Sequence, residues 1–345
     1  MLLPRRLAGF AGLVTVVALG APAFPARAQE SPVVRQLSPV LSLTPQDPSS
    51  AGGFGASLAF DGQHLVVGTP RSHLDPWRQA SGSVHFLSFH EGTFDWDWEY
   101  AIPTGAINEV LGGRVTLSGP FATAATASSG PSSGTNQGGS APGSIRLYGH
   151  DGDGWHLSGS IVPRFPDEPN GFGDAVILGS GLAVAAPGTA SGVREVSGAV
   201  LVYDRPFTGP PSAPHRIESP FPGRFTGFAG DLAAPDEDTL IVAAAGATVD
   251  GEAARGAVFV YRRTQTGWVE HQQIIDPGGR SHFYFGGSIA AFGNTLLVSS
   301  SVPSGPTRIH VLERDGDRWV SRGELEQPTG GILLPAMTLD GGWAA

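Results

Sequence analysis

The sequence predicts an all-β protein, a β-propeller built from four-stranded blades, and two periodic patterns carry that prediction. The first is an aromatic residue or Leu with small residues, an alternating strand, a tight turn and a second apolar strand. Its copies start at residues 54, 111, 172, 228 and 285, a spacing of 56 to 61 residues. The second is a tryptophan six residues before an aliphatic residue, at Trp96, Trp155, Trp268 and Trp319. Short sheets that repeat in this way must stack on one another, and radial stacking leaves only short edges exposed.

The first 28 residues have the features of a secretory signal peptide. Arg5 and Arg6 provide a positive end, residues 7–19 form an apolar run, and residues 26–28 form an Ala-x-Ala cleavage site before Gln29. We therefore expect cleavage near Ala28–Gln29 and a secreted, periplasmic or cell-surface protein. The apolar run is too short and too rich in glycine to favour a membrane span, so none is expected.

Residues 29–345 are expected to form a single propeller, closed by its two ends. Residues 33–43 resemble the last strand of a blade, because Leu43 precedes Phe54 by the interval that separates Ile274 from Phe285. Residues 331–345 resemble a partial last repeat, with an opening strand and an Asp340–Gly341 turn. We expect six sheets, one of them incomplete or completed by the N-terminal strand. A propeller of seven blades, of which this chain is a fragment, is the alternative.

The repeats share a recognisable residue pattern. Residues 54–70 begin Phe-Gly and end Gly-Thr-Pro, residues 172–187 begin Phe-Gly and end Ala-Ala-Pro, and residues 285–299 begin Phe-Gly-Gly. Later strands read Gly-Ser-Val-His-Phe at residues 82–86 and Gly-Ala-Val-Phe-Val-Tyr at residues 256–261. This residue pattern resembles the FG-GAP repeat, the blade motif of the integrin alpha-chain propeller and of many secreted bacterial proteins.

The FG-GAP resemblance implies recognition of a partner, in some members with calcium bound between the first two strands. The corresponding turns here depart from the calcium pattern. The fourth, residues 235–238, has several carboxylates but lacks their alternation and the glycine that bends a loop around the ion. Calcium remains possible, but these turns do not support it, and we expect no metal and no cofactor.

Composition excludes several kinds of chemistry. The chain has no cysteine, so disulfides and thiol chemistry are absent. It also has no lysine, which excludes a Walker-type phosphate site and a Schiff base. The formal net charge is −10, and signal-peptide removal takes away three arginines, so we expect no nucleic-acid partner.

Binding residues are expected in the loops that vary between repeats. The candidates come from residues 71–78 and from the segment that leads into the fifth repeat. They are Arg71, His73, Trp77, Arg78, Arg280, His282 and Tyr284.

No catalytic residue stands out. Asp151–Gly152–Asp153 and Asp315–Gly316–Asp317 could offer oxygen ligands to calcium, but Asp-Gly is ordinary hairpin-turn chemistry. Ser57 and Ser288 lack the last glycine of a nucleophile elbow. The periodic tryptophans are expected to fill the space between blades.

Two functions remain open, and the sequence favours a non-catalytic one. The first is a secreted module that binds or adheres to an extracellular protein or carbohydrate. The alternative is an extracellular hydrolase or lyase that acts on a polysaccharide, with carboxylates around the central channel. No carboxylate pair can be placed there from the sequence.

Overall fold

The fold is all-β. The structure is a computed structural model of the chain, and it describes residues 43–45, 53–70, 82–91, 93–101, 109–128, 143–162, 172, 174–186, 198–209, 211–221, 226–277, 283–301, 307–326, 339–340 and 343–344. Every regular element in these residues is a β-strand. Within them, no helix is long and apolar enough to cross a membrane.

Twenty of the strands form five four-stranded antiparallel sheets, which we number as blades 1 to 5. Blade 1 contains β1 (Ser57–Phe60), β2 (His64–Thr69), β3 (Ser83–His90) and β4 (Thr93–Ala101). Blade 2 contains β5 (Glu109–Ser118), β6 (Phe121–Ser128), β7 (Ser144–His150) and β8 (Trp155–Ile161). Blade 3 contains β9 (Ala175–Leu178), β10 (Gly181–Ala186), β11 (Ala199–Tyr203) and β12 (His215–Glu218). Blade 4 contains β13 (Phe228–Asp236), β14 (Thr239–Ala244), β15 (Ala257–Thr264) and β16 (Gly267–Ile274). Blade 5 contains β17 (Ile289–Phe292), β18 (Thr295–Ser300), β19 (Arg308–Asp315) and β20 (Arg318–Glu326).

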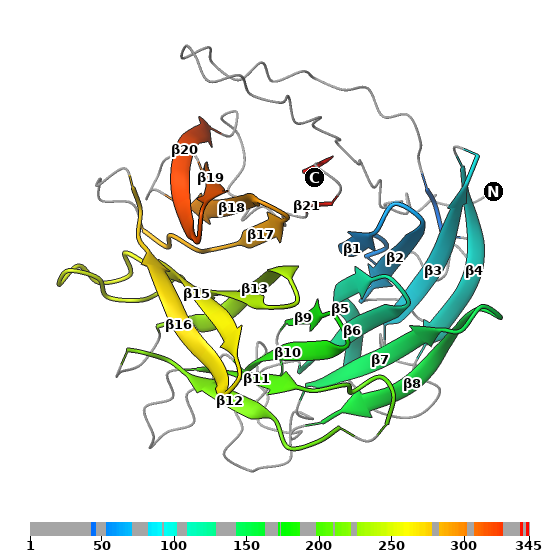
Figure 1. The fold of residues 1–345 in the computed structure, drawn as a ribbon. Coiled ribbons are helices and arrows are strands. Elements are labelled where there is room, and N and C mark those ends of the chain that lie inside the picture. The colour runs from blue at the N-terminus through cyan, green and yellow to red at the C-terminus, as the bar shows by residue number, and fades with distance from the viewer. Residues whose placement is uncertain are drawn as a thin grey trace, which may run out of the picture.

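The blades are arranged around a common centre, as Figure 1 shows. Strands within a blade pair in chain order, and the first strands, β1, β5, β9, β13 and β17, are successive neighbours on the inside. The predicted β-propeller of four-stranded blades is therefore confirmed. In blades 1, 3 and 5 the first strand begins three or four residues after the Phe that marks the repeat, whereas in blades 2 and 4 the strand already includes the marker, Leu111 or Phe228.

A short two-stranded sheet follows blade 5. It consists of β21 (Leu339–Asp340) and β22 (Trp343–Ala344), and β21 lies beside β17 as β17 lies beside β13. The strand expected at residues 33–43 lies outside the described residues except for its last residue. Leu43 packs against a blade 1 cluster that contains Phe54 and Leu87. The signal peptide also lies outside the described residues.

Four of the five hydrophobic clusters among the described residues lie between neighbouring blades, and the fifth is the blade 1 cluster that Leu43 contacts. One cluster joins blades 3 and 4, another joins blades 2 and 3, and further clusters join blades 4 and 5 and blades 1 and 2. Trp155 of blade 2 stacks on Phe86 of blade 1 with ring centroids 4.8 Å apart. Trp319 of blade 5 is buried against blade 4. These two tryptophans confirm the prediction that the periodic Trp residues fill the space between blades.

The contact between blades also explains the glycines of the repeat. Gly82 precedes β3 and forms a parallel bridge with Leu111, which opens the next blade's repeat. Its φ is 76°, and a Cβ there would lie 2.1 Å from the Leu111 carbonyl oxygen. Gly256 occupies the same place before β15, where a Cβ would lie 2.3 Å from the Phe285 carbonyl oxygen. Only glycine permits so close an approach of two backbones.

Candidate active site at the centre of the ring

The candidate site comes from one position of the repeat, near the start of the innermost strand. This position holds Ser57 in blade 1, Arg114 in blade 2, Asp231 in blade 4 and Ser288 in blade 5, each three residues after the repeat marker. In blade 3, Asp174 stands one residue earlier, directly before β9. Since the innermost strands are neighbours around the centre, three consecutive blades bring one arginine and two acids together.

Arg114 contacts both acids with the same nitrogen. Its Nη1 donates to Asp174 Oδ2 at 3.3 Å and to Asp231 Oδ1 at 3.1 Å. The Arg114 side chain is 50% exposed, whereas the two aspartates are buried. The guanidinium therefore reaches from solvent to a buried acidic pair and spans blades 2, 3 and 4.

Backbone N–H groups fix both carboxyl groups. Asp231 Oδ1 accepts from the Leu232 N–H at 3.1 Å, and its Oδ2 accepts from the Ile289 N–H of blade 5 at 2.8 Å. Asp174 Oδ1 accepts from the Ala175 N–H at 2.8 Å. Groups held in this way lose little freedom when they act on a bound molecule.

Burial dominates the protonation of Asp174. It raises the pKa of this carboxyl from 3.8 to about 8, against the opposing effect of the Arg114 charge. The Asp231 charge and hydrogen bonding with the Asp231 carboxyl contribute to this rise. In turn, the Asp174 charge raises the pKa of Arg114, which stays cationic. At neutral pH the pair therefore carries a proton on Asp174, beside a fixed positive charge.

The serines at the equivalent position make simpler contacts: Ser57 links blade 1 to blade 2, and Ser288 is bonded within blade 5. The Ser57 hydroxyl donates to the Gly112 carbonyl oxygen of blade 2 at 2.8 Å, and Ser288 N–H donates to Ser299 Oγ at 2.7 Å. In Arg114, Asp174 and Asp231, the same linking position carries ionisable groups.

The predicted binding residues do not contribute to this site as far as they are described. Arg71, His73, Trp77, Arg78, Arg280 and His282 lie outside the described residues. Tyr284 is half-exposed in the segment before β17, and its backbone N–H donates to the Ala254 carbonyl oxygen at 2.8 Å. Its φ is 60°, a left-handed conformation uncommon for a non-glycine residue.

The Asp-Gly segments form turns, as their sequence predicts. Gly152 and Gly316 have positive φ values of 91° and 63°. Asp151 Oδ1 accepts from the Asp153 N–H at 3.2 Å. Elsewhere, among the described residues, Asp276, His310 and Glu324 are the one group spaced to hold a metal ion, and they belong to blades 4 and 5 rather than to this site.

Comparison with known proteins places the fold. The chain is similar to the periplasmic gluconolactonase of Pseudomonas aeruginosa, with a TM-score of 0.52 and 15% sequence identity over 84% of this chain and 75% of that one. The likeness is to a lactonase-type propeller. A putative 6-phosphogluconolactonase of Bacteroides fragilis gives a TM-score of 0.49 and 14% identity, over 83% and 74% of the two chains. No protein-family model matches this chain, and no curated protein matches its sequence.

These findings correct the FG-GAP interpretation, which is wrong. No family model supports the resemblance, and the structural likeness is to lactonase propellers instead. The physical reason lies in the blade itself. Phe54 and Phe285 are buried between strands, and Gly55 and Gly286 have φ values of 80° and 92°. A Phe-Gly opening therefore suits this blade geometry, in which Leu111 and Ala229 take the same places in blades 2 and 4, and it does not identify one family.

The binding or adhesion module expected from that resemblance is overturned with it. The expectation depended on an FG-GAP family known for recognition and on the absence of lysine, thiol chemistry and metal loops, while no carboxylate pair could be placed near the centre from the sequence. The structure places Asp174 and Asp231 together there, and the solved propeller that the chain resembles is described as an enzyme.

Proposed function

We propose that this chain is a hydrolase of sugar-derived lactones, with Asp174 and Asp231 as its acid–base pair and Arg114 at its opening. The buried pair of carboxyl groups that contact one Arg114 nitrogen carries the proposal, because neighbouring carboxyls share a proton and so provide an acid and a base together. The name of the Pseudomonas aeruginosa gluconolactonase supports the choice of substrate class. This assignment replaces the binding module with an enzyme.

The reaction is the addition of water to the lactone carbonyl. The Asp231 carboxylate removes a proton from a water molecule as the water oxygen bonds to the carbonyl carbon. Arg114 donates hydrogen bonds to the carbonyl oxygen as negative charge develops on it. The bond between that carbon and the ring oxygen then breaks, and Asp174 gives its proton to the ring oxygen. The product is an open hydroxy acid, and transfer of a proton from Asp231 to Asp174 restores the site.

The alternative of glycoside hydrolysis fits these carboxyl groups less well. Glycosidases place their two acids on either side of the scissile bond, with about 5 Å or more between them. Asp174 and Asp231 both contact the same Arg114 nitrogen, so they lie side by side rather than on opposite sides of a bound sugar linkage. A proton-sharing acid pair acts from one side, which suits attack of water on an acyl carbon.

Turnover of glucono-1,5-lactone by the chain that begins at Gln29 tests the proposal. We expect base uptake in a pH-stat above the uncatalysed rate in the same buffer, and a loss of kcat/KM as the pH rises through about 8, where Asp174 ionises. Asp174→Asn should lower kcat by roughly 10²–10⁴-fold, because it removes the transferable proton. No turnover of this lactone or of related aldonolactones would refute the assignment.

A matched control separates chemistry from folding. Asp153→Asn changes an exposed acid in a hairpin turn and should leave kcat unchanged. Asp174→Asn should melt at or above the wild-type temperature, since asparagine resembles the protonated acid. An inactive variant that also melts early would assign Asp174 to blade linkage alone.

We further propose that the enzyme acts in the periplasm or outside the cell and that β21 and β22 begin a sixth blade. The charged n-region and cleavage site of residues 1–28 support export. The place of β21 beside β17, and the packing of Leu43 against blade 1, support completion of that blade by residues 33–43.

A further inference from the structure

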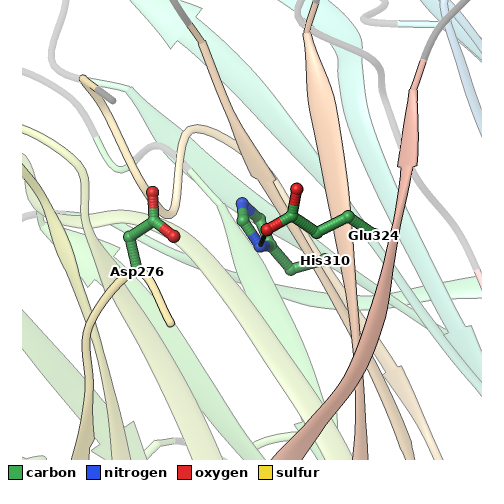
Figure 2. Close-up of side chains that lie close together, drawn as sticks. All are labelled: Asp276, His310 and Glu324. Carbon is green, nitrogen blue, oxygen red and sulfur yellow. Dashed lines mark ion pairs between the residues drawn. The ribbon is translucent and has the colours of Figure 1, made fainter. Parts of the chain in front are cut away.

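A second cluster of ionisable side chains lies between blades 4 and 5, outside the candidate active site. It consists of Asp276, in the segment that leaves β16, with His310 of β19 and Glu324 of β20 (Figure 2). One ligand atom from each residue lies within 4.8 Å of the other two. His310 is 0% exposed and Asp276 2%, whereas the Glu324 side chain is 27% exposed, so the cluster is buried with one side toward solvent.

The repeat shows that blade packing does not require a histidine at this place. His310 packs edge-on against Phe285, the opening residue of its blade, with ring centroids 5.1 Å apart. Phe259 occupies the equivalent position in blade 4 and packs against Phe228. Phenylalanine therefore fills the same space, so packing alone does not account for the ring nitrogens of His310.

Blade 1 provides a natural comparison for the acids. His85 occupies the same repeat position and packs against Phe54 at 5.4 Å, and its Nε2 lies 3.2 Å from Ser83 Oγ. Nine residues before Phe54 stands Pro45, where Asp276 stands nine residues before Phe285. Blades 1 and 5 thus share the buried histidine, but only His310 of blade 5 has the aspartate beside it.

Neighbouring residues orient the potential ligands. His310 Nε2 lies 2.9 Å from Ser300 Oγ, and donation from Nε2–H to this hydroxyl leaves the Nδ1 lone pair directed at the acids. Nδ1 lies 3.5 Å from Glu324 Oε1. Arg308 Nη1 donates to the other Glu324 oxygen at 2.7 Å, which fixes the carboxylate without occupying Oε1.

The cluster is not a catalytic triad, although the contacts run from a serine hydroxyl (Ser300) through an imidazole (His310) to a carboxylate (Glu324), as they do in a triad. Ser300 and His310 are buried within blade 5, so a substrate has no access to the hydroxyl. The same Ser–His contact recurs in blade 1 without an acid in the position of Asp276. The pairing of the serine hydroxyl with the imidazole therefore positions the ring.

We propose that Asp276, His310 and Glu324 bind a divalent transition metal ion of the zinc class. Ligand atoms about 2.0–2.2 Å from a tetrahedral zinc lie about 3.3–3.5 Å apart, close to the 3.5 Å between His310 Nδ1 and Glu324 Oε1. Two carboxylates and a neutral imidazole balance a 2+ charge in a buried place. The nitrogen ligand and the small ligand number disfavour calcium, which takes six to eight oxygens. The ion would link the segment after blade 4 to the outer strands of blade 5.

The test uses the full mature chain, stripped with EDTA and titrated with Zn²⁺ alone. We expect saturable calorimetric binding of one ion and a melting midpoint about 5 °C higher at saturating Zn²⁺, with no such rise in Ca²⁺. His310→Phe, which copies the blade 4 residue, should abolish both effects. Asp276→Asn provides a second variant that keeps shape and packing, and should weaken binding by at least 10-fold.

His85→Phe is the matched control, because it makes the same exchange in blade 1. It should bind Zn²⁺ as the unaltered chain does. The proposal is overturned if the unaltered chain binds no Zn²⁺, if His310→Phe and Asp276→Asn still bind it with unchanged affinity, or if Ca²⁺ replaces Zn²⁺ as the stabilising ion.

Discussion

At the scale of single residues, two buried groups make stability depend on pH in opposite directions. Burial lowers the pKa of His85 from 6.5 to about 4, and it raises that of Asp174 from 3.8 to about 8. Below pH 6.5 the unfolded chain takes up a proton at His85 that the folded chain does not, so stability falls toward pH 4. Between pH 4 and 8 the folded chain holds an extra proton on Asp174, so stability falls as the pH rises.

We predict that the melting midpoint falls from pH 6.5 to pH 8 and that Asp174 is responsible. Below pH 6.5 the two effects oppose each other, and above it Asp174 acts without His85. Asp174→Asn cannot ionise, so it should flatten this part of the curve and melt several degrees above the unaltered chain at pH 8. Thermal melts followed by circular dichroism at a series of pH values provide the measurement.

The acidic side of the curve serves as the control. His85→Phe removes the opposing effect of His85, so its melting midpoint should rise, relative to the unaltered chain, as the pH falls from 6.5 to 4, while the alkaline side stays unchanged. If Asp174→Asn and the unaltered chain lose stability equally from pH 6.5 to 8, the raised pKa of Asp174 is refuted.

The same residues show why the candidate site escaped the sequence. Asp174 and Asp231 could have been noticed, because they and Arg114 occupy a repeat position that elsewhere holds serine. Their meeting depends on the radial arrangement, which brings together residues 60 and 117 positions apart. Asp174 also stands two residues after its repeat marker, Phe172, rather than three. An alignment of repeats predicts a shared position, but not which charged groups face one another across three blades.

At the scale of the strand, backbone contact between blades sets the repeat. We predict that Gly256→Ala is far more destabilising than Gly251→Ala. Both glycines have φ near 80°, so each alanine incurs the same backbone strain of about 1–2 kcal/mol. Around Gly251 a Cβ meets nothing within 4 Å, whereas at Gly256 it lies 2.3 Å from the Phe285 carbonyl oxygen and 2.6 Å from its nitrogen.

The clash cannot be relieved by a side-chain rotation, since both atoms are backbone. Blades 4 and 5 must separate, which disrupts the cluster that contains Phe285 and Trp319. The measurement is the melting midpoint, where about 2–4 °C corresponds to 1 kcal/mol. Equal midpoints for the two variants would contradict the packing of β15 against the opening of blade 5.

At this scale the sequence was informative about form and misleading about family. The Phe residues, the tight turn after the first strand and the periodic Trp residues predicted the strands and the interfaces between blades. The turn is as expected, with Asp61 Oδ1 accepting from the Gln63 and His64 N–H groups at 2.9 and 2.7 Å. These same features suit any stack of such sheets and do not identify a family. They therefore suggested an FG-GAP repeat, although the structural likeness of the chain is to a gluconolactonase.

At the scale of the molecule, the ring needs a partner for its last strands. Two strands alone make a marginal sheet, and β21 and β22 pair through two residues each. We predict that residues 33–43 supply the outer strand of this sheet. Deleting residues 29–42 from the mature chain should lower the melting midpoint by 10 °C or more, an order-of-magnitude expectation for the loss of a strand with five large apolar residues.

Deletion of residues 29–32 provides the control, because these four residues precede the apolar stretch and should be dispensable. Both truncated chains would be compared by thermal melting and by limited proteolysis near Trp343, which should become accessible only in the longer deletion. The reason is mechanical: without the N-terminal strand, β21 and β22 lose their cover, while blades 1 to 5 keep their four interfaces. Unchanged melting of both chains would show that the N-terminal segment does not close the ring and would favour a longer propeller, of which this chain is a part.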